Sequence, residues 1–411
     1  MGDLPVEVSP IEVGFDPDRL ARIEHHFGAY VDDGRLAGWL AVVTRHGQVA
    51  YVSARGHRDR EAAVPVERDT LWRIYSMTKP ITSVAAMMLY EQGAFELKDP
   101  VHRYIESFRN QRVYRSGSSQ APVTVPATEP VRIWHMLTHT SGLTYGFHYA
   151  HPVDAMYRAA GFEWGSPADL DLAGSVDVWA SMPLLFEPGT EWNYSVSSDV
   201  LGRLIEVVSG QPLDQFLAEH IFEPLGMTDT GFVVDGSDAD RLATLYGAGP
   251  DRTAVRLEAA GQAALAPPAM LSGGGGLVSS AADYHRFTQM LRNRGELDGV
   301  RLLGSRTVDY MARNNLPGGA DLETVGRPLF AETTFDGVGF GLGFSVVLDP
   351  AANKVLSSPG EYAWGGAAST AFWVDPVEDI TALFFTQLLP SSTHPIRTQL
   401  KQLVYQALVD R

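Results

Sequence analysis

The chain has 411 residues, of which 45% are hydrophobic and 20% are charged, the composition of an ordinary globular protein with room for a sizeable core. Its formal net charge of −17 argues against nucleic acid and against an anionic membrane surface as partners, because both attract basic patches. The absence of cysteine excludes disulfides, thiol catalysis and cysteine-ligated metal sites.

The amino-terminal segment, MGDLPVEVSPIEVGFDPDRL, is acidic and has neither the basic region nor the apolar region of a secretory signal. No apolar run in the sequence approaches the roughly 18–20 residues that a membrane helix needs. We therefore expect a cytoplasmic protein that has no membrane partner.

In chain order, the hydrophobic pattern first predicts an amphipathic helix over residues 16–33. Two apolar runs, GWLAVVTR and QVAYVSARG, then flank a His-Gly pair and predict a β-hairpin. A further helix is expected to begin near Ser76 and to end at Gly93.

The middle of the chain, residues 94–200, is rich in proline, glycine, serine and tryptophan. Within it, the composition of RSGSSQAPVTVPATEP (115–130) predicts a loop. Helical patterns return at Ser198 and again over residues 212–222. A glycine-rich turn, SGGGGLVSS (272–280), leads into one more predicted helix.

Near the end, GFGLGFSVVLD, GAASTAFWVDP and DITALFFTQ each predict a strand, and a terminal helix follows them. Strands from the two chain ends are expected to share one antiparallel sheet, with a helical region inserted between them. The predicted fold class is therefore α/β in the broad sense that includes α+β. Residues 1–90 and 200–411 would form the domain that holds the sheet, and residues 91–199 a mainly helical domain.

Lysine is rare in this chain, since only four of its 32 basic residues are lysines, and Lys79 stands three residues after Ser76. Pro80 is typical of a first helical turn, so we expect Ser76 and Lys79 to share one helix face and to touch. A desolvated lysine can take the proton of a serine hydroxyl, and the helix dipole favours a negative reaction centre there. The alternative is a helix cap beside an ordinary surface lysine.

A nucleophilic serine also needs a second proton carrier and an oxyanion hole. WNYSVSSDVLG places Tyr194 in a loop just before a helix, where a phenol beside a lysine can act as acid or base. EYAWGGAAST places two glycines at the start of a predicted strand, where a backbone N–H could approach a substrate without obstruction. The alternatives are a core role for Tyr194 and simple sheet packing for Trp364.

Five motifs resemble, in this order, those of the family VIII carboxylesterases: SMTKPITSVAAMMLYEQG, MLTHTSGLTYGF, EWNYSVSSDVLGRLIEVVSGQPL, IFEPLGMTDTGF and GGGLVSSAADYHRF, followed by WGG. These enzymes are the esterase branch of the serine β-lactamase and penicillin-binding-protein superfamily. The resemblance covers nearly the whole chain. It implies an antiparallel sheet flanked by helices, a smaller helical domain and a site between the two.

The resemblance also implies what each site residue does. Ser76 would be the nucleophile, Lys79 its partner base and Tyr194 a general base or acid. The backbone N–H groups of Ser76 and Ala367 would form the oxyanion hole. Neither a metal nor an organic cofactor is implied, and the partner would be a small-molecule ester.

The sequence departs from the related class C β-lactamases at two places. Trp364, Gly365 and Gly366, which would border the substrate, stand where those enzymes have K-T-G, so a cation that could pair with a β-lactam carboxylate is missing. Val196 stands at the third position of Y-x-N, where an amide could hold the side-chain amide of a β-lactam. Both changes, together with the acidic net charge, favour uncharged esters over penicillins. We expect the substrates to be carboxylic esters with short acyl chains.

Three alternatives to an esterase remain open. An acyltransferase would form the same acyl-enzyme and transfer its acyl group to an alcohol or an amine. A β-lactamase or D-alanyl peptidase would form its acyl-enzyme from other substrates. A binding or sensor protein would be acylated once without turnover. The intact set of S-x-x-K, tyrosine and W-G-G argues against the sensor, since a decayed site usually loses one member.

HMLTH gives His135 and His139 the spacing of a zinc-protease helix, but Met136 stands where H-E-x-x-H has its glutamate. We therefore expect hydrogen-bonded structural histidines. The aromatic residues of the middle region fit either a substrate pocket or the core, namely Tyr145, Phe147, Phe162 and Trp164.

Overall fold

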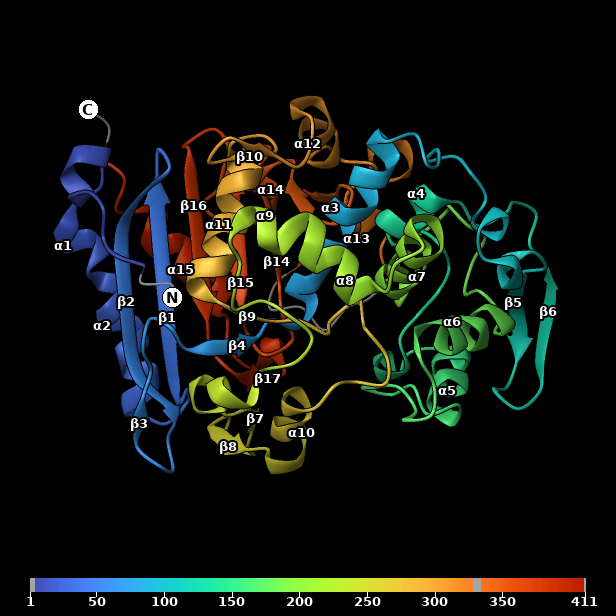
Figure 1. Cartoon of the computed structure of the whole chain (residues 1–411), viewed down its shortest axis with the longest axis horizontal. Coiled ribbons are helices and arrows are strands. Elements are labelled where there is room, and N and C mark those ends of the chain that lie inside the picture. The colour runs from blue at the N-terminus through green and yellow to red at the C-terminus, as the bar shows by residue number, and fades with distance from the viewer. Residues whose placement is uncertain (1–3, 328–333, 410–411) are drawn as a thin grey trace.

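The computed structural model describes residues 4–327 and 334–409. Its centre is an eight-stranded sheet in which every neighbouring pair of strands is antiparallel (Figure 1). In their order across the sheet, the strands are β12 (Val338–Phe340), β13 (Ser345–Val347), β14 (Tyr362–Gly365), β15 (Ala371–Asp375), β16 (Ile380–Phe385), β1 (Gly38–Arg45), β2 (Gln48–Asp59) and β3 (Val64–Pro65). The first and last parts of the chain meet where β1 pairs with β16, as the sequence predicted.

The predicted hairpin at the start of the chain is confirmed by β1 and β2. Its turn is formed by His46 and Gly47, which both have positive φ, 54° and 78°. Two such residues make the turn whose twist suits a pair of antiparallel strands. The His-Gly pair is therefore the local signal that sets this hairpin.

Side chains of the sheet alternate between its two faces, as the strand period requires. Trp39, Ala41 and Val43 point to one face, where they pack against amphipathic helices. These helices are α1 (Pro17–Leu20), α2 (Arg22–Asp32) and α15 (Ile396–Tyr405). Leu40 and Val42 point to the other face, where the larger core contains residues of α3 (Thr78–Glu91) and α11 (Ala281–Arg292).

A group of helices lies beside the sheet, on the side away from β1 and β2 (Figure 1). They are α4 (Ile133–Leu137), α5 (Pro152–Ala159), α6 (Leu172–Ser181), α7 (Ser197–Ser209) and α8 (Leu213–Leu217), whereas α9 (Glu223–Leu225) is seen in front of the sheet in this view. One buried core runs from the sheet through α3 into this region, and the expected boundary at residue 200 falls inside α7. The division into two domains stays a prediction.

Smaller elements complete the chain. They are β4 (Leu71–Arg73) with β9 (Val278–Ser280), β7 (Tyr246–Ala248) with β8 (Ala254–Arg256) and β17 (Leu388–Leu389), β10 (Glu296–Leu297) with β11 (Val300–Arg301), and the helices α10 (Glu258–Gln262), α12 (Ser305–Met311), α13 (Leu322–Val325) and α14 (Pro350–Asn353). The pairing of β4 with β9 matters most for the site, because Ser76 follows β4 and the glycine-rich turn precedes β9. None of the helices in the described part of the chain is long and apolar enough to cross a membrane.

The loop expected over residues 115–130 is wrong in part. β5 (Arg112–Gly117) pairs with β6 (Pro122–Pro126) in an antiparallel hairpin. Proline and serine dominate the composition, yet Val123 and Val125 stand on either side of Thr124, the alternation of a strand. The two prolines stand at the ends of β6, where a strand tolerates a missing N–H.

The single strand expected from GFGLGFSVVLD is also wrong. The segment contains two short antiparallel strands, β12 and β13, joined by a tight turn. Gly343 has a φ of 97°, which an extended strand does not allow, and the Gly341 N–H donates to the Phe344 carbonyl at 2.8 Å. Glycine's access to positive φ reverses the chain where the apolar alternation suggested continuity.

Candidate active site

Ser76 sits in a short, constrained turn between β4 and α3. The Ile74 N–H donates to the Leu277 carbonyl at 3.0 Å, and the Met77 N–H donates to the Ile74 carbonyl at 3.0 Å. Between them Tyr75 has a φ of 42°, a backbone conformation that is uncommon for a bulky residue and that the surroundings must enforce. The expectation of a helix start near Ser76 is confirmed, since α3 begins at Thr78.

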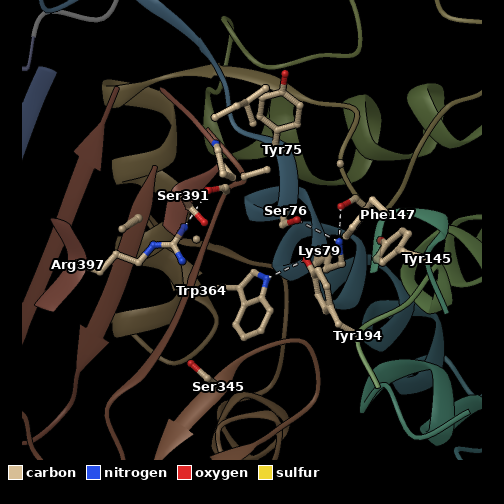
Figure 2. A pocket seen from close by; sticks show the side chains of 18 of the residues that line it. Tyr75, Ser76, Lys79, Tyr145, Phe147, Tyr194, Ser345, Trp364, Ser391 and Arg397 are labelled. Atoms are coloured by element: carbon tan, nitrogen blue, oxygen red, sulfur yellow. Dashed lines mark hydrogen bonds between the residues drawn. The ribbon is translucent and has the colours of Figure 1, made fainter. Parts of the chain in front are cut away.

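Lys79 lies in the first turn of α3 and is almost fully buried, with 1% of its surface exposed. Its Nζ lies 3.3 Å from Ser76 Oγ and donates to the Gly274 carbonyl at 2.6 Å. The two residues therefore touch, as their three-residue spacing predicted. Figure 2 shows both contacts as dashed lines.

Asp199, which the sequence analysis did not single out, holds the turn that supplies the Gly274 carbonyl. This buried carboxylate accepts hydrogen bonds from Ser272 Oγ at 2.5 Å and from the Gly274 N–H at 3.0 Å. Burial raises the pKa of Asp199 above its ordinary value, and the nearby Lys79 opposes that rise. A side chain on Gly274 would lie within 3.0 Å of the carboxylate, so glycine is needed for this close approach.

Tyr194 comes from the loop before α7 and lies against Lys79. Nζ of Lys79 is 4.5 Å from the centre of the Tyr194 ring. Nε1 of Trp364 donates to the phenolic oxygen of Tyr194 at 3.4 Å (Figure 2). The Tyr194 carbonyl lies within hydrogen-bonding distance of His148 Nε2, at 2.7 Å, and of Asn193 Nδ2, at 3.3 Å, so its backbone is fixed from two sides.

A second tyrosine, Tyr145, stands beside the same groups. Its ring centre is 5.4 Å from Nζ of Lys79 and 5.4 Å from the Tyr194 ring centre. Burial, together with Asp199 and Tyr194, raises the pKa of Tyr145 well above its ordinary value. Tyr145 therefore keeps its proton near neutral pH and is unsuited to act as a base.

The W-G-G motif occupies a different place in its strand from the one expected. Trp364 and Gly365 end β14, and Gly366 begins the turn to β15, so the glycines do not start a strand. A Cβ on Gly366 would lie within 3.0 Å of the Ile74 carbonyl and of Thr370 Oγ1. Atoms of Ile74 and Thr370 thus occupy the space that a side chain at position 366 would need. Glycine there lets this turn pack against the turn that carries Ser76.

Ala367 follows in the same turn. Its N–H donates no hydrogen bond to any atom of the described residues. All seven residues expected to form the site line one cavity of about 1010 Å³, namely Ser76, Lys79, Tyr194, Trp364, Gly365, Gly366 and Ala367. A cavity lined by an unpaired amide, a buried lysine, a phenol and a serine contains the parts that acyl transfer requires.

The aromatic residues of the middle region contribute to this cavity. Tyr145 stacks on Phe147 with 4.6 Å between ring centres, and Phe147 stacks on Trp164 with 4.7 Å. Both Phe147 and Trp164 line the cavity, and Trp164 is exposed. Phe162 also borders it but is mostly buried against Trp179. The stacked rings form an apolar wall that leads from Lys79 towards solvent.

The two histidines of HMLTH are each hydrogen-bonded to a separate partner. His135 Nδ1 accepts from the Arg132 N–H at 3.0 Å, and His139 Nδ1 lies 3.2 Å from Ser195 Oγ. Burial lowers the pKa of His135 to about 3. Within residues 4–327 and 334–409, no three His, Cys, Asp or Glu side chains gather closely enough to hold a metal ion.

Comparisons with known proteins show which proteins this chain is similar to. A sequence profile of the family described as Beta-lactamase matches residues 23–406. Esterase EstB of Burkholderia gladioli is 33% identical over 404 residues, which cover 94% of this chain and 95% of that protein. An uncharacterized protein of Mycobacterium tuberculosis is 36% identical over 367 residues, covering 87% of this chain and 88% of its own length.

Among solved structures, EstCE1, described as a hydrolase with promiscuous acyltransferase activity, superposes with a TM-score of 0.79. It is 29% identical in sequence, and the match covers 94% of this chain and 99% of that one.

Proposed function

Because the chain belongs to the Beta-lactamase family, we propose that it is a serine carboxylesterase that hydrolyses carboxylic esters through an acyl-enzyme on Ser76. The observation that carries the proposal is the contact between Ser76 Oγ and the buried Nζ of Lys79, 3.3 Å apart. The similarity to Esterase EstB, over 94% of this chain, supports ester hydrolysis as the reaction.

In the first half of the reaction, Ser76 Oγ attacks the ester carbonyl while its proton passes to the Lys79–Tyr194 pair. The backbone N–H groups of Ser76 and Ala367 stabilise the oxyanion that forms. The proton then goes to the leaving alkoxide, the carbon–oxygen bond of the ester breaks and the alcohol departs. Lys79 Nζ lies 4.5 Å from the centre of the Tyr194 ring, so the two side chains are treated as one base.

In the second half, water attacks the acyl-enzyme. The same pair removes a proton from this water and returns one to Ser76 as the acid is released. Tyr145 takes no part in proton transfer, since it holds its own proton. No step calls for a metal or an organic cofactor.

The cavity suits an uncharged ester. Trp364 presents an apolar wall beside Tyr194, and the stacked rings of Tyr145, Phe147 and Trp164 continue that wall outward. A volume of about 1010 Å³ accommodates a sizeable alcohol group next to a short acyl chain. A short acyl preference and a cytoplasmic location stay predictions.

The first experiment is steady-state hydrolysis of p-nitrophenyl acetate, butyrate and octanoate, with nitrocefin in parallel. We expect ester turnover with little nitrocefin cleavage. Ser76→Ala should lower kcat by about four orders of magnitude or more, and Lys79→Met by about 10²–10⁴-fold. Ser237→Ala and Lys98→Met change exposed residues outside the cavity and serve as matched controls. Ester turnover that survives in Ser76→Ala would refute the mechanism.

Acyl transfer is a second candidate activity. EstCE1 is described as a hydrolase with promiscuous acyltransferase activity, and the cavity of this chain has room for an acceptor alcohol beside the acyl group. Adding a primary alcohol during turnover and measuring new ester against free acid separates the two activities. Formation of free acid alone, at every alcohol concentration, would exclude the transferase.

A further inference from the structure

The turn that carries Ala367 is held by a cation from the far end of the chain. Arg397 is the second residue of α15, and its Nη2 donates to the Gly366 carbonyl at 2.8 Å and to the Thr370 carbonyl at 3.2 Å. The Gly366 N–H donates in turn to the Thr370 carbonyl at 3.0 Å. Arg397 thus binds both ends of the turn between β14 and β15.

One of these two carbonyls has a special position. The Gly366 carbonyl and the Ala367 N–H belong to the same peptide unit, which is planar. In the described residues only Leu389–Pro390 is cis, so this peptide is trans and its C=O and N–H point in opposite directions. A guanidinium fixed on the oxygen side therefore directs the N–H away from Arg397, and both Ala367 and Ser76 line the cavity.

The two glycines of W-G-G make this arrangement possible. A Cβ on Gly365 would lie within 3.0 Å of the Arg397 guanidinium, and a Cβ on Gly366 would lie within 3.0 Å of the Ile74 carbonyl. Glycine at 365 admits the cation, and glycine at 366 lets the turn pack against the segment that precedes Ser76. The turn that carries Ala367 is thereby packed against the segment that leads into Ser76.

Helix formation does not explain an arginine at this position. A cation in the first turn of a helix is opposed by the helix dipole, by about 0.3–1 kcal/mol at an exposed site. A charged hydrogen bond to a peptide oxygen, by contrast, draws electron density from the amide and makes its N–H a stronger donor. A fixed positive charge on that side is also favourable when negative charge develops near the N–H.

We propose that Arg397 is a positioning residue that orients and polarises the Gly366–Ala367 peptide, so that the Ala367 N–H can stabilise the oxyanion. The inference rests on the proposed ester hydrolysis. It assigns Arg397 a role in the transition state, because its Nη2 donates to the backbone carbonyls of this turn. Figure 2 shows Arg397 reaching in from the side of the cavity opposite Lys79.

The test compares Arg397→Met with Arg45→Met in hydrolysis of p-nitrophenyl butyrate and in binding of phenylboronic acid. The boronic acid adds to a serine Oγ and places a hydroxyl where the oxyanion forms. Arg45 is a matched control, because it also donates to backbone carbonyls, those of Glu378 and Val13, but lies outside the cavity. Thermal unfolding of each variant confirms that it is folded at the assay temperature.

Loss of the guanidinium should lower kcat by about 10–100-fold, less than the roughly 10²–10³-fold cost of removing an oxyanion donor outright, while KM changes less than twofold. Phenylboronic acid should bind more weakly by a similar factor. Arg397→Lys, which keeps a charge but not the fork of donors, should recover part of the loss. Arg45→Met should keep the wild-type kcat and affinity.

A wild-type kcat in folded Arg397→Met, a fall confined to KM, or unchanged boronate affinity would each overturn the inference. If Arg397→Met does not fold, Arg397→Gln replaces it, since glutamine keeps an N–H donor but no charge, and the same losses are expected. Failure of the proposed esterase function would give a different result, namely ester turnover in Ser76→Ala at the rate of the wild type.

Discussion

The indole N–H of Trp364 donates to the phenolic oxygen of Tyr194 across 3.4 Å, and this bond constrains where the phenol can send its own proton. An indole nitrogen is a donor only, so the Tyr194 oxygen must accept from it. The hydroxyl hydrogen is then directed away from Trp364, and Lys79 Nζ lies 4.5 Å from the ring centre. Trp364 therefore does more than provide an apolar wall.

Trp364→Phe should lower kcat by about 2–10-fold, the worth of one hydrogen bond, because phenylalanine keeps the contacts with Tyr194 and Phe340 but lacks the N–H. The measurement is a double-mutant cycle with Tyr194→Phe. In the Tyr194→Phe background, the change at Trp364 should have no further effect on kcat. Equal effects in both backgrounds would show that Trp364 acts independently of the phenol.

The two tyrosines beside Lys79 should respond very differently to loss of their hydroxyls. Tyr194→Phe should lower kcat by about 10²–10⁴-fold, as expected for a proton carrier. Tyr145→Phe should lower it less than tenfold, since burial and Asp199 keep Tyr145 protonated. Steady-state kinetics on p-nitrophenyl butyrate measures both. Losses of the same size would contradict the assignment of the base to Tyr194.

Gly366→Ala should reduce both stability and activity, because the added methyl meets the Ile74 carbonyl and Thr370. Overpacking of this kind lowers the free energy of unfolding by about 1–3 kcal/mol, and movement of the turn should cut kcat by more than about tenfold. Gly236→Ala is the control, since nothing lies within 4 Å of its Cβ position. Urea unfolding and kinetics are measured on both, and a Gly366→Ala enzyme with normal kcat would mean that the turn can shift without harm.

Asp283 should make stability depend on pH in the direction opposite to that of a salt-bridged carboxylate. Burial raises the pKa of Asp283 to about 6, and hydrogen bonds from Thr230 and from the Asp229 N–H oppose that rise. The pKa of Asp283 in the folded protein thus lies above the model-peptide value of 3.8. Its contribution to the free energy of unfolding is therefore fully present below about pH 4 and is lost as the pH rises through about 6.

The measurement is the free energy of unfolding of wild type and Asp283→Asn at pH 4.5 and pH 7.5. Relative to the variant, wild type should lose about 1–3 kcal/mol between the two pH values, because one pKa unit corresponds to about 1.4 kcal/mol. Asp169→Asn changes an exposed carboxylate and should leave the pH dependence unaltered. Parallel curves for wild type and Asp283→Asn would show that this carboxyl titrates normally.

Several features of the fold were predicted from residues close together in sequence. The hairpin of β1 and β2 follows from two apolar runs around His46 and Gly47. The start of α3 follows from Pro80, and the contact of Ser76 with Lys79 follows from three-residue spacing in a helical turn. Each depends on backbone geometry within one turn, so it can be inferred without knowing the rest of the chain.

Predictions went wrong where tertiary contacts override local pattern. Ser83 occupies the space beside Gly343 in the turn that separates β12 from β13. Arg397 and Ile74 occupy the space beside the glycines of W-G-G, which end a strand. Asp199 acts on the site by accepting from the Gly274 N–H, and Arg397 acts on it by donating to the Gly366 carbonyl. A hydrogen bond to a backbone atom does not require a particular side chain on the residue that supplies that atom, so the sequence gives no sign of it there.

The sequence by itself thus determined the fold class, the serine–lysine pair and the candidates for the remaining roles, because periodicity and short-range spacing are written into neighbouring residues. Only the tertiary structure decided which tyrosine lies against Trp364, what holds the Gly274 carbonyl on Lys79, and what orients the Ala367 amide. Those relationships join residues that are as far apart in the sequence as Tyr194 and Trp364. They exist only because strands from both chain ends close one sheet and its helices bring their side chains to one cavity.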